Sequence, residues 1–382
     1  MKIEKLELFK IPPRWLFLKI ITKSGITGWG EPVLEGKTDS VAATVMDMKE
    51  YLIGQDASRI EDIFNLLGKG GFYRGGAIMM SAISGIEQAL WDIKGKYLDT
   101  PVYNLIGGAV RDKIHVYSWI GGDRPAELAR QAEIRIKAGY KALKMNACGK
   151  IEWIVSLSEI KKVKERVEEL RLIVGEKIGI GIDFHGRVHK TAIKRLVKEL
   201  EEFYPMFYEE PVLPEYSDQL KNIATFTTVP LALGERLMGR REFKLLIEEG
   251  IVDIIQPDIS HTGGIWETRK IAAMAETSNI AVAPHCSVGP IAFAASLQIN
   301  ACCPNAIIQE TSQGIHYNVE ADMLDYVVNR ADFTIKDGFI STPSKPGLGI
   351  EIDEEIVKEM AKVDHNWRNP IWRGEDGSLL EW

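Results

Sequence analysis

The sequence has few cysteines, and none of them forms a C-x-x-C pair. The four are Cys148, Cys286, Cys302 and Cys303. Small disulfide scaffolds and thiolate metal sites are normally built from several cysteines at regular spacings. We therefore expect buried free thiols in a reducing compartment, and with them a cytoplasmic location.

The chain also lacks the features of a membrane protein or of a nucleic-acid-binding protein. Its most apolar long segment, residues 280–303, is interrupted by His285, Gly289 and Pro290, so it does not predict a membrane span. The opening MKIEKLELF has no apolar core of an export signal. The net charge is −7 and no lysine- or arginine-rich block occurs, which argues against a nucleic-acid surface. A small anionic substrate would then need a metal or a few local cations.

The first part of the chain predicts an α+β domain. Its length of 382 residues allows two or three domains, and 45% apolar with 26% charged residues is typical of a globular protein. Alternating apolar residues over residues 1–31, with a turn at 23–25, predict an antiparallel sheet. From Asp39 to Lys96 the apolar residues follow a helical period instead. We expect an N-terminal α+β capping domain over residues 1–112, with the glycine-flanked loop GGFYRGG at 70–76 between two helices.

From residue 113 onward, short apolar runs alternate with helical patterns. The predicted strands begin near Lys113, Lys141, Gly179, Met206, Pro230, Val252, Ile280 and Ala306. Strands that alternate with helices form a parallel sheet, and a series of this length closes into a barrel. We expect the barrel over residues 113–314. The alternation is lost in residues 315–382, and we expect this C-terminal segment to return to the cap.

Polar residues stand at the ends of successive predicted strands, one about every 25 residues, as expected for one strand, one helix and two loops. Asp183, Glu209 and Glu235 end three consecutive strands. Acidic residues in that position are often only solvated or used as helix caps. Three of them embedded in apolar runs would be costly to bury without a cation. Oxygen-only ligands favour Mg²⁺, with Mn²⁺ as the alternative.

Two histidines and two further acidic residues continue this series. His185 lies two residues beyond Asp183, so on one extended strand both side chains point to the same face, which makes His185 a further ligand or a proton donor. His285 and Asp258 end the seventh and sixth strands, where the carboxylate can fix the tautomer of the imidazole and raise its basicity. Asp258 could instead cap the following helix. Glu310 ends the last strand and could stabilise a developing negative charge, or pair with a nearby lysine or arginine.

With these residues in view, the chain resembles the mandelate-racemase branch of the enolase superfamily, and in particular its sugar-acid dehydratases. The resemblance runs over nearly the whole chain and rests on PPRWLFLKI (12–20), GWGEPV (28–33), GFYRGG (71–76), QALWDIKGK (88–96), YSWIGGDRP (117–125), DFHGRV (183–188), EEPVL (209–213), GER (234–236), QPDISH (256–261), APHC (283–286), GIHYN (314–318) and WRNPIWR (367–373). Each motif alone is weak, but so many in the same order are specific.

The resemblance implies a (β/α)7β modified TIM barrel with an α+β cap, and a homo-oligomer. It also implies one Mg²⁺ per subunit, held by the three strand-end carboxylates already named. His285, oriented by Asp258, would remove the α-proton of a sugar acid, and His185 would protonate the departing 3-hydroxyl. Glu310 would stabilise the enediolate.

One departure from the branch bears on the stereochemistry. Many relatives end the second barrel strand in K-x-K, whose second lysine is a base, and here the residues are Lys144-Met145-Asn146. A base on only one face of the substrate disfavours racemisation and suits a one-way elimination from a 2R acid. Asn146 then becomes a candidate substrate-binding residue. Cap loops near Arg14 and Tyr73 are the candidates for recognising the 4-hydroxyl.

Other functions fit the sequence less well. A gluconate dehydratase or a sugar-acid dehydratase of broader specificity would use the same machinery. A Schiff-base aldolase could use Lys144 but needs no carboxylate triad. A metal-dependent hydrolase would show H-x-H on the first barrel strand, where this chain has His115-Val116-Tyr117. A non-catalytic sugar-acid binding protein would be expected to have lost part of the site.

Overall fold

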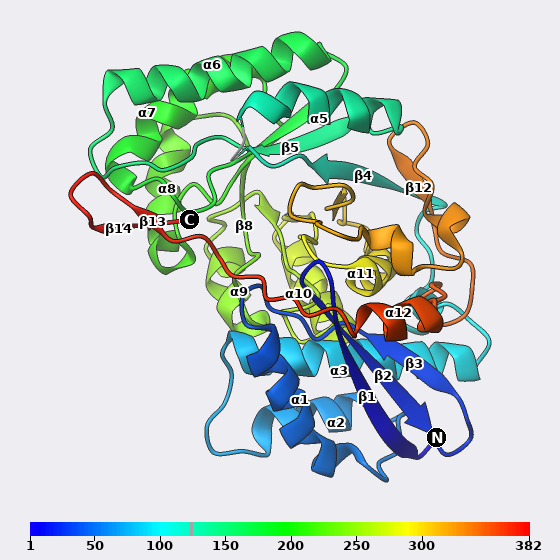
Figure 1. The fold of residues 1–382 in the computed structure, drawn as a ribbon. Helices are drawn as coiled ribbons and strands as arrows, with labels where there is room; N and C mark the ends of the chain where they lie inside the picture. The colour runs from blue at the N-terminus through cyan, green and yellow to red at the C-terminus, as the bar shows by residue number, and fades with distance from the viewer. Residues whose placement is uncertain (123–124) are drawn as a thin grey trace.

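The computed structural model describes residues 1–122 and 125–382, and its first part is the predicted antiparallel sheet (Figure 1). Asp123 and Arg124, within the YSWIGGDRP motif, lie outside the described residues. The strands are β1 (Ile3–Ile11), β2 (Trp15–Thr22) and β3 (Thr27–Gly30), with β2 in the middle. β2 has the sequence WLFLKIIT and is buried along nearly its whole length instead of alternately. A strand that is buried on both faces must have other elements packed against each face.

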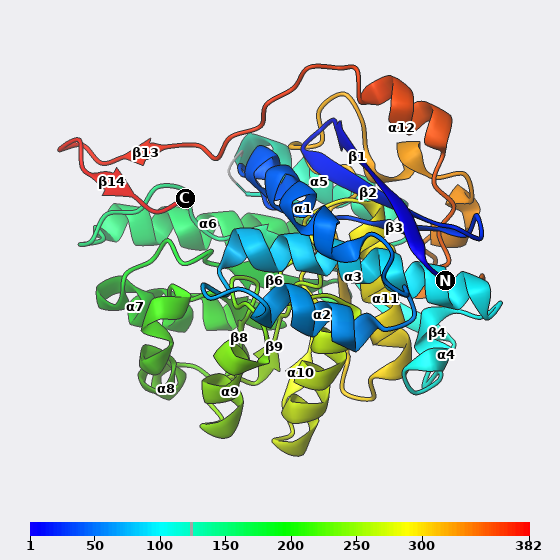
Figure 2. The same cartoon turned by 90° about the horizontal axis from the view of Figure 1, so that it is seen from below.

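Helices and the C-terminal segment provide these two covers (Figure 2). The helices of the cap are α1 (Thr38–Leu52), α2 (Ile60–Lys69), α3 (Ala77–Tyr97) and α4 (Val102–Leu105), and α3 packs against β2 and β3. From the C-terminal segment, the Tyr326 ring lies edge-on against Trp15 and Phe17, with centroids 5.9 and 5.7 Å away. Helix α12 (Glu354–Met360) packs against β1, and its Glu354 pairs with Lys19 at 2.6 Å.

Within the part of the chain that the structure describes, eight parallel strands form the barrel, in the order β10-β9-β8-β7-β6-β5-β4-β11. They are β4 (Lys113–Trp119), β5 (Ala142–Asn146), β6 (Gly179–Asp183), β7 (Phe207–Glu209), β8 (Leu231–Leu233), β9 (Ile254–Ile255), β10 (Ala281–Val282) and β11 (Gln309–Thr311). The ring closes between the last two strands, where Ile307 N donates to Val282 O at 2.9 Å and Val282 bridges Ala306. The predicted capped barrel is thus confirmed.

The helices between the strands surround the barrel, with one exception to the predicted alternation. They are α5 (Pro125–Lys137), α6 (Leu157–Val174), α7 (Lys190–Leu200), α9 (Arg240–Glu248), α10 (Ile265–Thr277) and α11 (Pro290–Cys302). Between β7 and β8 the chain forms only α8 (Leu220–Ile223) and 3₁₀ turns at 214–219 and 224–226. Tyr216 leaves the helical region, at φ −115° and ψ 24°, and so interrupts the segment.

The C-terminal segment also contributes strands. β12 (Phe339–Ser341) pairs antiparallel with the start of β4, and β13 (Trp372–Arg373) pairs with β14 (Leu379–Leu380) as a separate hairpin. The division of the chain after residues 112 and 314 stays a prediction. Among the described residues, no helix combines the length and the apolar character that a membrane crossing requires. All four cysteines are free and buried.

Two buried carboxylates of the cap bind the N-terminal ends of barrel helices. Glu87, on α3, accepts hydrogen bonds from the backbone N–H groups of Ile265 and Trp266 at 2.7 and 2.8 Å, at the start of α10. Glu31, just after β3, accepts from Gly289 and Ala292 at 2.7 and 3.0 Å, at the start of α11. Helix N-termini leave unpaired N–H groups with a partial positive charge, so these carboxylates fix the cap to the barrel.

Replacing Glu87 by Ala is expected to lower the free energy of unfolding by about 2 kcal/mol, because it leaves buried N–H donors without an acceptor. Glu87→Gln keeps an acceptor and should lose less. The measurement is urea denaturation followed by circular dichroism. Glu61→Ala is the control, since Glu61 is exposed and pairs with Lys270 of the same helix α10. A Glu87→Ala protein as stable as the control would contradict the capping role.

Candidate active site

The three predicted metal ligands lie at the carboxyl ends of adjacent barrel strands. Asp183 is the last residue of β6 and pairs in register with Glu209, the last residue of β7. Glu235 follows β8 by two residues. Their exposed fractions are 2%, 0% and 9%. The parallel register therefore buries the three carboxylates together at the barrel mouth.

Lys144 neutralises part of this negative charge from beneath. Its Nζ lies 2.6 Å from Glu209 Oε1 and 2.7 Å from Glu310 Oε1, and the side chain is only 2% exposed. The second oxygen of Glu209 accepts a hydrogen bond from Gln256 Nε2 at 2.6 Å. Burial lowers the pKa of Lys144, but the charges of Glu209 and Glu310 outweigh it and hold the pKa well above its ordinary value. Lys144 is a fixed ammonium ion.

The donor set of this cluster suits a hard divalent cation. Burial is the largest cause that raises the pKa of Asp183, to about 6, and the charge of Glu235 adds to it. Burial likewise raises the pKa of Glu209, as does the charge of Asp183. Carboxylates that destabilise one another in this way are stabilised by a cation with oxygen preference, such as Mg²⁺. As the side chains stand, no group of three or more His, Cys, Asp or Glu among the described residues is already arranged as a metal site, and Glu209 is held by Lys144 and Gln256.

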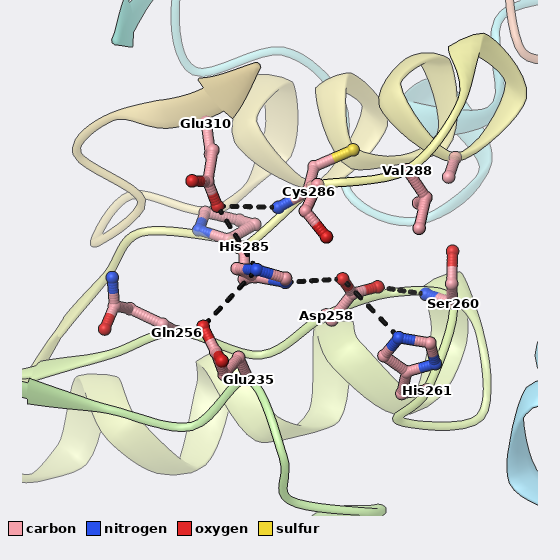
Figure 3. Close-up of polar contacts among 12 residues, drawn as sticks. Glu235, Gln256, Asp258, Ser260, His261, His285, Cys286, Val288 and Glu310 are labelled. Carbon is pink, nitrogen blue, oxygen red and sulfur yellow. Dashed lines mark hydrogen bonds and ion pairs between the residues drawn. The ribbon is translucent and has the colours of Figure 1, made fainter. Parts of the chain in front are cut away.

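His285 lies three residues beyond β10, in the middle of a set of carboxylates (Figure 3). Its Nδ1 is 2.7 Å from Asp258 Oδ2, and its Nε2 is 3.3 Å from Glu235 Oε2 and 3.6 Å from Glu310 Oε2. Burial lowers the pKa of His285, but the charges of Glu235 and Glu310 and the hydrogen bond to Asp258 outweigh this effect and raise the pKa to about 10. At this pKa both ring nitrogens of His285 are protonated at pH 7. Because the Nδ1–H is held by Asp258, Nε2 is the atom that can lose and regain a proton.

Glu310 is in the middle of β11 and fully buried. Its Oε2 accepts a hydrogen bond from the backbone N–H of Cys286 at 3.0 Å, which ties the carboxylate to the loop that carries His285 (Figure 3). The other oxygen of Glu310 pairs with Lys144, so the lysine pairing considered from the sequence is present, and the carboxylate also faces Nε2 of His285. Its role in stabilising a developing negative charge stays a prediction.

His185 reaches the same site by a different backbone path from the one predicted. β6 ends at Asp183, and His185 has φ +52°, so the extended conformation assumed from the sequence is wrong. The turn is held by the His185 N–H, which donates to Asp183 Oδ1 at 2.6 Å. The imidazole Nε2 lies 3.8 Å from Glu235 Oε1. Burial is the largest cause that lowers the pKa of His185, to about 3, and the charge of Arg187 adds to it. The imidazole is therefore neutral at pH 7.

Of the three predicted substrate-binding residues, Asn146 lines the cavity, whereas Arg14 and Tyr73 do not. Asn146 ends β5, lines the cavity with His185 and His285, and accepts a hydrogen bond from Trp119 Nε1 at 3.0 Å. Arg14, 2% exposed, lies behind the cavity wall, pairs with Glu35 and donates to Ser287 O at 2.7 Å. Tyr73 is 87% exposed and contacts Phe72, so the structure does not bring it to this site.

The cavity that joins these residues has a volume of about 50 Å³. A second, wider cavity of about 390 Å³ adjoins it on the side of the cap and shares Glu35, His185, Glu235 and His285 with it. Sequence reasoning did not single out Arg187, Gln256, Glu35 or Trp382. Arg187 and Gln256 stand inside quoted motifs, DFHGRV and QPDISH, and could have been noticed there. Glu35 and Trp382 carry no comparable signal.

Comparison with known proteins agrees with this architecture. The model of the enolase C-terminal domain-like family matches residues 127–356, and that of the mandelate racemase / muconate lactonizing enzyme N-terminal domain matches residues 13–107. The chain belongs to the mandelate racemase branch of the enolase superfamily.

Particular relatives agree with the predicted resemblance. The chain is 50% identical, over all 382 residues and the full length of each relative, to D-galactonate dehydratases of Ralstonia pickettii and of Pectobacterium atrosepticum. Among solved structures, a mandelate racemase/muconate lactonizing enzyme from Sulfitobacter sp. matches with a TM-score of 0.87 at 29% identity, over 97% of this chain and 98% of that one. One from Jannaschia sp. CCS1 matches with 0.86 at 28%, over 96% and 100%.

The charge on His285 predicts how stability depends on pH in EDTA-treated protein. The folded pKa of about 10 lies above the unfolded value of about 6.5, so the pairing of the imidazolium contributes stability fully below pH 6.5. That contribution is lost as the pH rises through 10. The melting temperature of the wild type should exceed that of His285→Asn most near pH 6, and the difference should shrink towards pH 10. A difference that grows with pH would contradict the assignment.

Proposed function

We propose that this protein dehydrates D-galactonate to 2-dehydro-3-deoxy-D-galactonate and water, with the barrel-mouth residues as its catalytic groups. The observation that carries the proposal is the Asp258–His285 pair beside a buried carboxylate cluster. It stands in a chain that matches D-galactonate dehydratases from end to end. A hydrogen next to a carboxylate is only weakly acidic. Its removal therefore needs both an oriented base and stabilisation of the charge that develops.

His285 is the base. With Nδ1 held by Asp258, Nε2 takes the proton from C2 of the acid, and the electron pair moves into an enediolate. The 3-hydroxyl then leaves with a proton supplied by His185, giving water and an enol that becomes the 2-keto product. His185 is neutral before substrate binds, and the negative charge of the bound acid raises its pKa, which loads it for this step. Glu310, held by Lys144 and Cys286 N, faces Nε2 of His285. Its role would be to hydrogen-bond the oxygens that become more negative.

Asp183, Glu209 and Glu235 would hold one Mg²⁺ per subunit, with Mn²⁺ as the alternative. A bound cation would supply Lewis-acid stabilisation of the carboxylate oxygens, worth several kcal/mol. The fit rests on the oxygen-only donors and on the raised pKa values of Asp183 and Glu209. Burial also raises the pKa of Glu235, but the charge of His285 outweighs it and the pKa is lowered. Glu209 would exchange one of its present contacts, to Lys144 or Gln256, for the cation.

The charge of Lys144 argues against a Schiff-base reaction and against racemisation. A lysine that acts as a base or forms a Schiff base needs a lowered pKa, whereas the pKa of Lys144 is raised by Glu209 and Glu310. Asn146 occupies the position of the second lysine of K-x-K. Only His285 remains as a base, on one face, which favours elimination from a 2R acid over racemisation. D-gluconate is also 2R, so a gluconate or broader sugar-acid dehydratase is the alternative.

We further infer a cytoplasmic enzyme that assembles as a homo-oligomer and binds neither nucleic acid nor membranes. The free, buried cysteines support a reducing compartment. The net charge of −7 opposes binding to nucleic acid or to an anionic membrane surface.

Replacing His285 by Asn should abolish exchange of the C2 hydrogen of D-galactonate with solvent deuterium. It should also lower kcat by about 10²–10⁴-fold, the usual contribution of a general base. The measurement is proton NMR of the substrate in D₂O with Mg²⁺. Exchange at the rate of the wild type would overturn the role of His285.

His185→Asn is the matched variant, because it removes the second imidazole of the same cavity. It should lose dehydration by a similar factor and retain measurable C2 exchange, since the base is intact. An unchanged rate of elimination in this variant would rule out the acid role of His185.

Removing divalent cations with EDTA should stop turnover, and Mg²⁺ should restore it, because the carboxylate cluster then regains its counter-charge. The assay follows the 2-keto-3-deoxy product across a panel of five- and six-carbon aldonates. We expect the highest kcat/KM with D-galactonate. Turnover that is indifferent to chelation would contradict the triad, and a higher kcat/KM with D-gluconate would favour the alternative.

A further inference from the structure

The last residues of the chain run along one side of the molecule, from α12 to the β13–β14 hairpin and back towards the barrel (Figures 1 and 2). After α12 the chain passes the cap loop, where Arg368 Nη1 donates to Gly36 O at 2.9 Å, and then forms the β13–β14 hairpin. Trp372, in β13, lies under the guanidinium of Arg187 at 4.7 Å. Gly377, at φ +84°, closes the turn and sends the chain back towards the mouth. Leu380 is buried at the end of the hairpin.

Trp382 then enters the site itself. Its indole lies edge-on to the imidazole of His185, with centroids 5.6 Å apart, and its ring centroid is 6.0 Å from that of Trp367 and 6.3 Å from that of Tyr317. It lines both the 50 Å³ cavity beside His285 and the 390 Å³ cavity towards the cap. The indole therefore stands at the boundary between the two.

The order of residues along the site gives this boundary a chemical meaning, provided that the proposed function holds. His285 acts at C2 and His185 at C3, so the group that covers the far side of His185 faces C4 and the carbons beyond it. That group is Trp382. Behind it, the guanidinium of Arg14 lies 5.6 Å from the Tyr317 ring and 5.5 Å from the Trp367 ring, and it pairs with Glu35.

We propose that Trp382 is a specificity-determining residue whose indole forms the subsite for the distal carbons of the sugar acid. An open polyol chain has C–H bonds along its backbone and hydroxyls at its edges. The flat face of the indole ring matches the C–H bonds. The carboxylate of Glu35, which pairs with Arg14, matches the hydroxyls. The subsite thus selects for chain length, because each carbon beyond C3 adds contact with the ring.

The test compares D-galactonate with L-arabinonate, which has the same configuration at C2 to C4 but one carbon fewer. Wild-type enzyme should favour the six-carbon acid by about tenfold in kcat/KM, mainly through KM. Trp382→Ala should bring the two acids to within about twofold, with Trp382→Phe in between. The loss in Trp382→Ala should appear mainly as a higher KM for D-galactonate, because the indole contacts the distal carbons of the substrate.

Leu379→Ala is the matched control, since Leu379 is 66% exposed in the same hairpin and lines neither cavity. It should keep the preference of the wild type. If Trp382→Ala fails to fold, Trp382→Phe decides. An unchanged preference, or an equal loss on both acids, would overturn the subsite while leaving the proposed function in place. A wild-type enzyme that dehydrates neither acid would overturn the proposed function, and this inference with it.

Discussion

The main constraint on this structure is buried negative charge, because the barrel mouth holds more carboxylates than cations. Uncompensated buried charge costs several kcal/mol per ion. Lys144, with one oxygen of Glu209 on one side and one of Glu310 on the other, offsets part of that cost and at the same time fixes both carboxylates. Because Glu235 and Glu310 in turn lie beside His285, the proton affinity of its imidazole is set by the same charges. Stability and catalytic competence are therefore not separable at this site.

The walls of the site come from parts of the chain that are distant in sequence. The barrel strands supply the groups assigned to proton transfer, and these groups sit on rigid elements. Glu35 from a cap loop and Trp382 from the C-terminal hairpin reach the same cavity. This division fits a fold family in which one set of strand-end residues serves many reactions while loops select the substrate. The C-terminal segment has both tasks, since it covers β2 through Tyr326 and brings Trp382 to the cavity.

The barrel and its strand-end residues could be predicted because parallel strands bring their carboxyl ends to one edge, so spacing in sequence becomes proximity in space. The local backbone conformation could not be predicted. The backbone of His185 has a positive φ, where the sequence suggested a continuing strand. The contacts of β12 and Trp382 were also beyond prediction, because neither follows a periodic pattern. Tyr73, a candidate from an exposed glycine-flanked loop, lies away from the site, and its role stays a prediction.

The two cap carboxylates that bind barrel helices limit how this enzyme can move. Glu31 and Glu87 tie α11 and α10 to the cap, and the loop that carries His285 leads directly into α11. A hinge rotation of the whole cap would break these buried bonds and displace His285, so large domain closure is disfavoured. Substrate entry and product release are then left to short peripheral segments, whose sequence can drift towards a new substrate without disturbing the proton-transfer groups.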